Sequence, residues 1–497
     1  MFASPTETDI APGGSLLGLL QRGRGDGWLH ALAAPRAEAV AAVDHCVLHD
    51  PRHDWQLEHR SLYYARLYAE LDAGLDAIAA HLADPDDLLL PDEERTGLAL
   101  SVLGHLTGLT HSSGSTAARL NTSALALLRQ YAVHGANWRW ALDELAVHDD
   151  DAGLAAIGPA VLARFPAGEE GDAALAAAVR DAFEPRPWHL WARDPARPAQ
   201  RARLARALEA GSFDRWQRQL RPPGPRPGWS VGAVLAWAQD GWDSVPRQWR
   251  EAPAARCLGA VAGPGDRPEL LAAAADGAPA ARAAALRHLA ERDDPDVCPL
   301  IEAAATAPDA DVARAALTAF TRMCGPDALA HARRWARRDD ALGTTAATVL
   351  ARRGDPGDAP AVLDALRRAL RRHGAQAEEL RPLIEGAGRL GIRGAVPVLR
   401  RVYRETASSR LRGEAAGALA VTDPSFAAGF AVECLWDCEE DTRATGARHA
   451  TTVDARVVER LRRLAADPAE QADVQTAVRG RLGGRPGGTR APSDRGA

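Results

Sequence analysis

Four side chains of metal-binding type lie close together near the N-terminus. They are His45, Cys46, His49 and His53, and a helix through this stretch would place His45 and His49 one turn apart. Two such imidazoles, completed by Asp50 or His53, form a candidate metal site. The stretch lacks the His-Glu-x-x-His pattern of metal-binding helices. We therefore expect a solvated helix end without a metal or other cofactor. A metal-dependent enzyme that uses His45 and His49 is the remoter alternative.

A second candidate combines aromatic rings with a carboxylate. Trp138, Arg139 and Trp140 precede Asp143, and aromatic rings together with Arg can hold nucleic acid. Against this, residues 1–183 contain 12 Arg and 26 acidic residues, and their net charge of −14 repels phosphate. We expect a protein partner, with Trp138 and Trp140 as candidate contacts. Nucleic-acid binding or DNA repair is the alternative function.

Arginine doublets form a third candidate. They occur at Arg333-Arg334, Arg337-Arg338, Arg367-Arg368 and Arg371-Arg372, so that two successive doublets are spaced by one helical turn. Each set makes a basic stripe, which is either a solvated helix face or one edge of a groove for an acidic partner. We take Arg334 and Arg338 as candidate partner contacts.

The sequence lacks the motifs of the common enzyme classes. We find no Gly-rich phosphate loop after a predicted strand, no nucleophile elbow and no pair of carboxylates at catalytic spacing. We therefore expect a non-enzymatic protein and identify no small-molecule site.

An internal repeat determines the elements that position these residues. From about Arg267 to Leu482 one short unit recurs about seven times, and Pro295, Pro326 and Pro356 mark successive units 31 and 30 residues apart. Each unit has an apolar stretch with helical spacing, a polar turn and an Ala-rich stretch. Pro is tolerated in the first turn of a helix, and a preceding Asp can cap it. One such hairpin cannot bury its apolar face alone, so the units are expected to stack.

The second halves of the units align at Ala281-Arg282-Ala283, Ala313-Arg314-Ala315 and Leu411-Arg412-Gly413. This pattern resembles the HEAT-repeat family, in particular the short bacterial HEAT-like repeats of the PBS-lyase type. The resemblance implies an all-α fold, an α-solenoid of helical hairpins whose second helices line a concave surface for a protein partner. It also implies that Arg282, Arg314 and Arg412 are either ladder residues between repeats, which we favour, or contacts to the partner.

Three enzyme families with HEAT-like folds bear on the function. Deoxyhypusine hydroxylases place iron on paired His-Glu motifs, which this sequence lacks, and no pigment-binding signature of phycobilin lyases is present. Alkylpurine DNA glycosylases use aromatic residues with an Asp in a HEAT-like groove, and Trp138, Trp140 and Asp143 are similar to that set. A protein-interaction scaffold remains our first expectation, and a glycosylase-like DNA-repair protein is the second.

Composition predicts five segments along the chain. Residues 1–15 are expected to be a disordered lead-in, and 16–183 a divergent helical N-terminal lobe. Residues 184–265, which hold seven of the 13 Trp and many Pro and Arg, are expected to connect the lobe to the repeats, with an extended stretch at 222–227. The HEAT-like repeats occupy 266–483, and a disordered tail follows at 484–497. Within the lobe, periodicity predicts helices at residues 37–48, 55–82, 94–109, 115–133, 138–147, 154–165 and 171–183.

Cysteine usage and hydropathy bear on the compartment. The 497 residues include six Cys without regular spacing, which indicates a reducing environment. The N-terminus lacks the basic region of a signal peptide, and the longest apolar run, residues 97–110, is too short and too polar to span a membrane. We expect a cytoplasmic protein without membrane contact.

Overall fold

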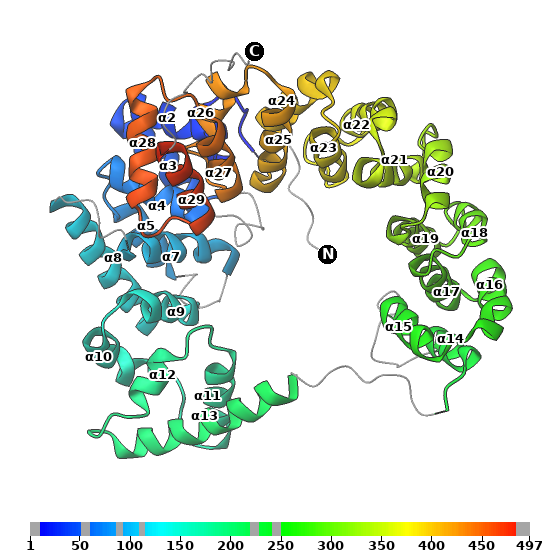
Figure 1. The fold of residues 1–497 in the computed structure, drawn as a ribbon. Coiled ribbons are helices and arrows are strands. Elements are labelled where there is room, and N and C mark those ends of the chain that lie inside the picture. The colour runs from blue at the N-terminus through cyan, green and yellow to red at the C-terminus, as the bar shows by residue number, and fades with distance from the viewer. Residues whose placement is uncertain are drawn as a thin grey trace, which may run out of the picture. The chain divides into compact units, whose positions relative to one another are not determined.

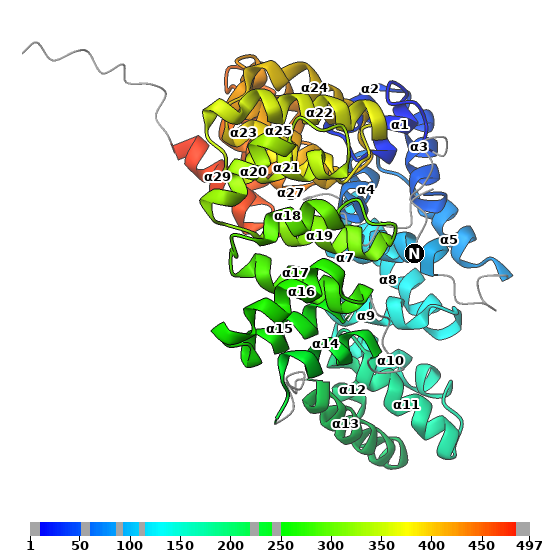
Figure 2. The same cartoon turned by 90° about the vertical axis from the view of Figure 1, so that its right-hand side faces the viewer.

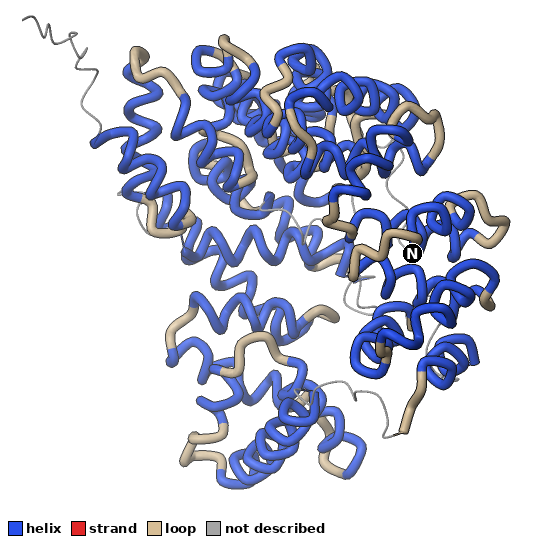
Figure 3. The backbone as a smooth tube through the Cα atoms, turned by 45° about the vertical axis from the view of Figure 1, so that its right-hand side comes forward, coloured by secondary structure: helices blue, strands red, loops and turns tan. Residues whose placement is uncertain are grey.

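The computed structural model describes residues 10–50, 60–85, 93–108, 115–218, 228–240 and 250–483. Every regular element in these ranges is a helix, as the alternation of blue helices and tan loops in Figure 3 shows. The predicted all-α fold of stacked helical hairpins with a divergent N-terminal lobe is confirmed. None of the helices in the described ranges combines the length and the apolarity that a bilayer crossing requires.

The chain forms two compact units. Unit 1 comprises Met1–Leu220, Arg404–Ala416 and Ser425–Ala497, and unit 2 comprises Arg221–Tyr403 and Gly417–Pro424. The N-terminal lobe and the last repeats of the chain therefore share one unit.

The N-terminal lobe contains the predicted helices, one of them divided, and also α1 and α2, which the periodicity did not predict. The helix expected at 55–82 is divided into two, because Asp72 adopts a left-handed φ of 47° and the flexible Gly74 follows it. Residues 55–59 lie outside the described residues. The helices of the lobe are α1 (Leu16–Gln21), α2 (Gly25–Ala33), α3 (Arg36–Leu48), α4 (Arg60–Glu70), α5 (Asp76–Leu82), α7 (Glu93–Gly108), α8 (Ser115–His134), α9 (Trp138–His148), α10 (Asp151–Leu162), α11 (Glu169–Asp181), α12 (Arg186–Trp191) and α13 (Pro198–Arg218).

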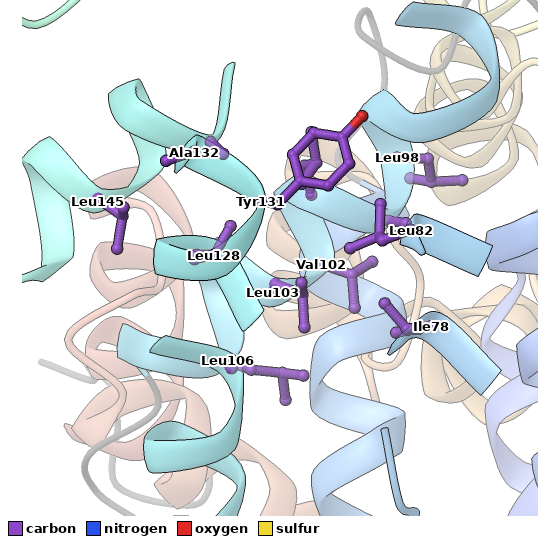
Figure 4. Packing of buried hydrophobic residues seen from close by; sticks show 14 of the residues in the cluster. Ile78, Leu82, Leu98, Val102, Leu103, Leu106, Leu128, Tyr131, Ala132 and Leu145 are labelled. Carbon is purple, nitrogen blue, oxygen red and sulfur yellow. The ribbon is translucent and has the colours of Figure 1, made fainter. Parts of the chain in front are cut away.

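The core of the lobe is a continuous cluster of aliphatic and aromatic side chains. Figure 4 shows Ile78 and Leu82 of α5 facing Val102 of α7, with Leu128 and Tyr131 of α8 on the other side. Ile78, Val102 and Leu128 are completely buried. The helical spacing of these apolar residues thus translates into one shared core, which single hairpins do not provide.

Most of the segment expected to connect the lobe to the repeats is helical. Trp188 and Trp191 of α12 are buried, and the Trp188 ring lies 6.3 Å from the Trp138 ring and 6.4 Å from the Phe165 ring. These rings attach α12 to the core of the lobe, because each buries a large apolar area. The predicted extended stretch at 222–227 and the predicted tail at 484–497 lie outside the described residues. The domain boundaries remain predictions.

Unit 2 is a row of helix pairs. Figure 1 shows α17, α19, α21 and α23 along one side of this row and α16, α18, α20 and α22 along the other. Two of the second helices, α19 and α21, begin with Asp caps; at α19 the Asp309 carboxylate accepts hydrogen bonds from the N–H groups of Asp311 and Val312. The helices of unit 2 are α14 (Val231–Asp240), α15 (Glu251–Val261), α16 (Arg267–Asp276), α17 (Pro279–Glu291), α18 (Val297–Ala304), α19 (Ala310–Arg322), α20 (Pro326–Trp335), α21 (Ala341–Arg353), α22 (Ala359–His373), α23 (Leu380–Arg389) and most of α24 (Val396–Glu405).

The last repeats continue this order to the end of the described chain. They contain α25 (Ser409–Thr422), α26 (Phe430–Cys434), α27 (Glu440–His449), α28 (Ala455–Ala466) and α29 (Ala472–Gly483). Helices α16 to α29 make seven pairs between residues 267 and 483, all of which are described, in agreement with the predicted number of units.

Within unit 1 the start of the chain packs on its last repeats. The Cys438 N–H donates to the Gly23 carbonyl at 2.9 Å, and Arg24 forms an ion pair with Glu433 at 2.8 Å. Gly23 has a φ of 65°, and a Cβ there would lie 2.4 Å from the Cys438 sulfur, so glycine is required on both counts. Residues 10–15 of the expected lead-in also belong to this packed segment, since Ile10 is buried and Ser15 caps α1. The lobe therefore covers the last repeats, so that their apolar side does not face solvent. Solenoids without such a cover protect their ends with polar capping repeats.

Candidate functional site

The second helices of unit 2 pack directly against one another from α15 through α23. Small residues make this close approach possible. A Cβ added to Gly386 of α23 would lie 2.4 Å from the Cβ and 2.7 Å from the Cα of Ala351 on α21. Close packing along one side of a stack of hairpins bends the stack toward that side and creates an extended binding surface. The solvent side of these helices, here named the second-helix face, carries the exposed residues Arg256, Arg314, Arg322, Arg352, Arg353 and Glu385.

Two of the aligned arginines, Arg282 and Arg314, lie on these helices but differ in environment. Arg282 is half-buried, and its Nε donates to the Ala274 carbonyl in the last turn of α16 at 3.0 Å. Arg389 makes the same type of bond between successive repeats, from its Nε to the Ala351 carbonyl at 2.9 Å. Such bonds satisfy carbonyls that a helix end leaves free. Arg314 is exposed and pairs only with Asp311 of its own helix, at 2.7 Å, among the described contacts.

Arg412, the third aligned arginine, is in the core of unit 1. The side chains of Arg412 and Asp437 are both 0% exposed, and the guanidinium donates to the two carboxylate oxygens at 2.7 and 2.9 Å. The Gly23 carbonyl lies 3.5 Å from Arg412 Nη2, because the N-terminal segment covers this repeat. The side chain of Arg412 does not reach solvent, so of the two alternatives for this residue the ladder between repeats, which the sequence favoured, fits better than a contact to a partner. No local sequence signal reveals this burial, since Asp437 and Gly23 are 25 and 389 residues away.

Arg334 and Arg338 lie at the end of α20, on the first-helix side of unit 2. Arg334 is exposed, approaches the Trp335 ring at 5.9 Å and hydrogen-bonds His331 Nδ1 at 2.6 Å. Arg338 pairs with Glu302 and with Asp340, each at 2.8 Å. Arg334 thus lies at the surface, and Arg338 links the end of α20 to the preceding repeat within unit 2.

The aromatic candidates divide in the same way between core and surface. Trp138 is buried and contacts Phe165, with 5.7 Å between ring centroids. Trp140 is half-buried, and its indole N–H donates to Ser101 at 3.1 Å and to Glu144 at 3.3 Å. The Ser101 hydroxyl also donates to Glu144, at 2.9 Å.

Glu144 is the most perturbed carboxyl group near these aromatic residues, and sequence reasoning missed it. Burial raises its pKa to about 7, although the hydrogen bonds from Ser101 and Trp140 act in the opposite direction. The carboxylate lies against Gly104, where a Cβ would be 1.9 Å from Glu144 Oε2. Burial also raises the pKa of Asp143, whose Oδ1 accepts the Glu184 N–H at 3.2 Å. The i, i+4 spacing of Trp140 and Glu144 was the available signal.

The structure brings the His45 and His49 rings together at 5.3 Å and places the His81 ring 6.4 Å from His49. Asp50, the proposed third ligand, instead forms an ion pair with the buried Arg60 at 2.7 Å. His53 lies outside the described residues. Among the described side chains, no group of three or more His, Cys, Asp or Glu has the geometry of a metal site.

Comparison with protein families agrees with the architecture of the repeats. The family model of HEAT repeats matches residues 267–347, which extend from the start of α16 into α21. A search of curated proteins gives no match to the chain.

Proposed function

This chain is a HEAT-repeat protein, and we propose that it acts as a non-enzymatic scaffold whose second-helix face binds a protein partner. One observation carries the proposal. Arg352 and Arg353 at the end of α21 are exposed and make no hydrogen bond or ion pair with a described residue. The buried arginines Arg412 and Arg443, by contrast, are both engaged in ion pairs. Arginine is enriched at protein interfaces, where its guanidinium pairs with carboxylates and packs on apolar groups.

The surroundings of the candidate residues support a protein partner over nucleic acid. Trp138 is enclosed by aromatic rings, and the indole N–H of Trp140 is already hydrogen-bonded. Neither ring is therefore well placed both to stack on a base and to hydrogen-bond to nucleic acid. The acidic N-terminal lobe adds long-range repulsion of phosphate. We also propose a cytoplasmic location; in its support, the six cysteines, which all lie in the described ranges, form no disulfide there.

Affinity purification from the native cell tests the scaffold function. A face variant carries Arg314→Glu, Arg352→Glu and Arg353→Glu. A control variant carries the same number of charge reversals at the exposed Arg201, Arg410 and Arg462. We expect a protein that co-purifies with the intact chain to be lost with the face variant and kept with the control. Equal recovery with both variants would contradict the proposed face.

A further inference from the structure

Helix geometry divides the arginine doublets of unit 2 into two sets, because consecutive residues on a helix point about 100° apart. In the doublets of the first helices, one member is tied to a neighbouring element, although Arg333 and Arg372 among these members are themselves exposed. Arg333 pairs with Asp358 at 2.9 Å, and Arg400 pairs with Asp423 at 2.7 Å. These inner members are Arg333, Arg338, Arg368, Arg372 and Arg400.

The other member of each doublet is exposed. Arg337 and Arg371 have no ion-pair partner among the described residues, and Arg367 has only Asp364 at 3.8 Å. These residues lie in the C-terminal halves of the first helices α20, α22 and α24 or directly after them, and Figure 2 shows these three helices in the upper part of the view. We name this set the outer arginine stripe, and it consists of Arg334, Arg337, Arg367, Arg371 and Arg401.

The inner members fix the spacing of the stripe. Arg368 donates to the Ala336 carbonyl directly after α20 at 3.0 Å, and Arg372 pairs with Asp339 at 3.0 Å, so that α22 is tied to the segment that follows α20. Charges spaced by one turn on the same helix are about 5–6 Å apart. An extended peptide, which rises about 3.3 Å per residue, can place alternate carboxylates on such a set.

The stripe is a local feature and is not required by the fold. Arginine in the last turn of a helix interacts favourably with the helix dipole. Yet α16 and α18, the equivalent first helices earlier in unit 2, have no basic residue in their last turns. The exposed positions of α16 include Glu269 and Asp276 instead. Repeats with and without the arginines therefore adopt the same structure.

We propose that the outer arginine stripe is a docking surface for an Asp- and Glu-rich segment of another protein. The planar guanidinium forms two parallel hydrogen bonds with a carboxylate, which favours arginine over a simple point charge at such a site. Nucleic acid is the weaker candidate, because the whole chain has a net charge of −6 and its first 183 residues a net charge of −14. The stripe lies on first helices, so the inference does not rest on the second-helix face.

Fluorescence anisotropy with a labelled oligoglutamate peptide tests the inference on the full chain. A stripe variant carries Arg334→Glu, Arg367→Glu and Arg401→Glu, and a matched control carries Arg201→Glu, Arg410→Glu and Arg462→Glu, three exposed arginines outside both proposed surfaces. We expect the intact chain and the control to bind the peptide with an affinity that falls as salt is added. The affinity of the stripe variant for the peptide should be lower by about tenfold or more, since each exposed charge contributes a few-fold.

Three outcomes would overturn the stripe. The first is equal peptide binding by both variants, and the second is loss of binding by the control alone. The third is tighter binding of single-stranded DNA or phosphatidylserine vesicles than of the peptide.

Circular dichroism checks that both variants are folded. If the stripe variant unfolds, Arg337→Gln with Arg371→Gln replaces it, since neither residue has an ion-pair partner among the described residues. Unchanged peptide binding by that variant contradicts the inference.

Discussion

The ion pair between Arg412 and Asp437 leads to a sharp prediction about stability. Arg412→Met removes the charged group that pairs with both oxygens of Asp437 while keeping a long side chain. The Asp437 carboxylate is then left buried and without its countercharge. Removing one partner of a buried ion pair destabilises a protein by about 3–5 kcal/mol.

The double variant Arg412→Met with Asp437→Leu separates the contribution of the ion pair to stability from the contribution of burying the two side chains. Replacing both charges by apolar groups is often neutral for stability. Hydrogen bonds outside the pair are still lost, because Asp437 Oδ1 also accepts the Glu439 N–H at 3.0 Å, and Arg412 Nη2 also donates to the Gly23 carbonyl and to Cys438 Sγ over longer distances of 3.5 Å. We therefore expect the double variant to be destabilised by only about 1 kcal/mol. The coupling energy of the mutant cycle is then about 3 kcal/mol or more.

Urea unfolding followed by circular dichroism measures these changes, and hydrogen exchange locates them. Exchange should accelerate in α26 and α27, which contact Arg412 through Asp437, and in α1 and α2, which the Gly23 turn joins. Arg314→Met is the matched control, because Arg314 occupies the aligned position but is exposed, and it should change stability by less than about 1 kcal/mol. If Arg412→Met is no more destabilising than Arg314→Met, the assignment of a buried ion pair is wrong.

Three further predictions follow from single residues. Gly386→Val should destabilise unit 2 by about 1–3 kcal/mol through overpacking against Ala351. A thermal melt equal to that of Gly259→Val, a position within α15 where an added Cβ meets nothing, would contradict the close approach. Leu317→Pro should break α19 at a cost of ~3 kcal/mol or more, which Leu317→Ala does not reproduce if helix disruption is the cause. The raised pKa of Glu144 means that the folded state keeps its proton above pH 4.5, where the unfolded state loses it. Its contribution to stability is therefore complete below the unfolded pKa and is lost as pH rises through the folded pKa of about 7. Between about pH 5 and about pH 8 the urea midpoint of the wild type should fall relative to Glu144→Gln by an equivalent of about 1–3 kcal/mol, and parallel pH profiles would rule this out.

Local patterns were sufficient for the repeats. Pro326 and Pro356 lie at the start of a first helix and of the short helical turn before one, and the Ala-rich stretches form the second helices. These rules act over a few residues, so sequence alone reveals them. The break at Asp72 between α4 and α5 was missed, because the apolar periodicity continues through the turn and hides it.

Sequence could not determine which candidate residues are exposed. The doublet Arg337-Arg338 contains one exposed and one ion-paired arginine. Which of the two is paired depends on the position of Glu302 in the preceding repeat. Likewise, the raised pKa of Glu144 depends on its burial against Gly104 of a different helix. Both are contacts between elements, and neither follows from the spacing of residues within one.

The aligned arginines show where the two kinds of information separate. The sequence by itself determined that Arg282, Arg314 and Arg412 lie at equivalent places on second helices, because helix period and repeat period are local properties. The tertiary structure decided that Arg282 bonds a helix end, that Arg314 faces solvent and that Arg412 is fully buried. The difference arises because the N-terminal segment around Gly23 folds over the last repeats, and burial depends on all elements that pack on a site and not on the site's own helix.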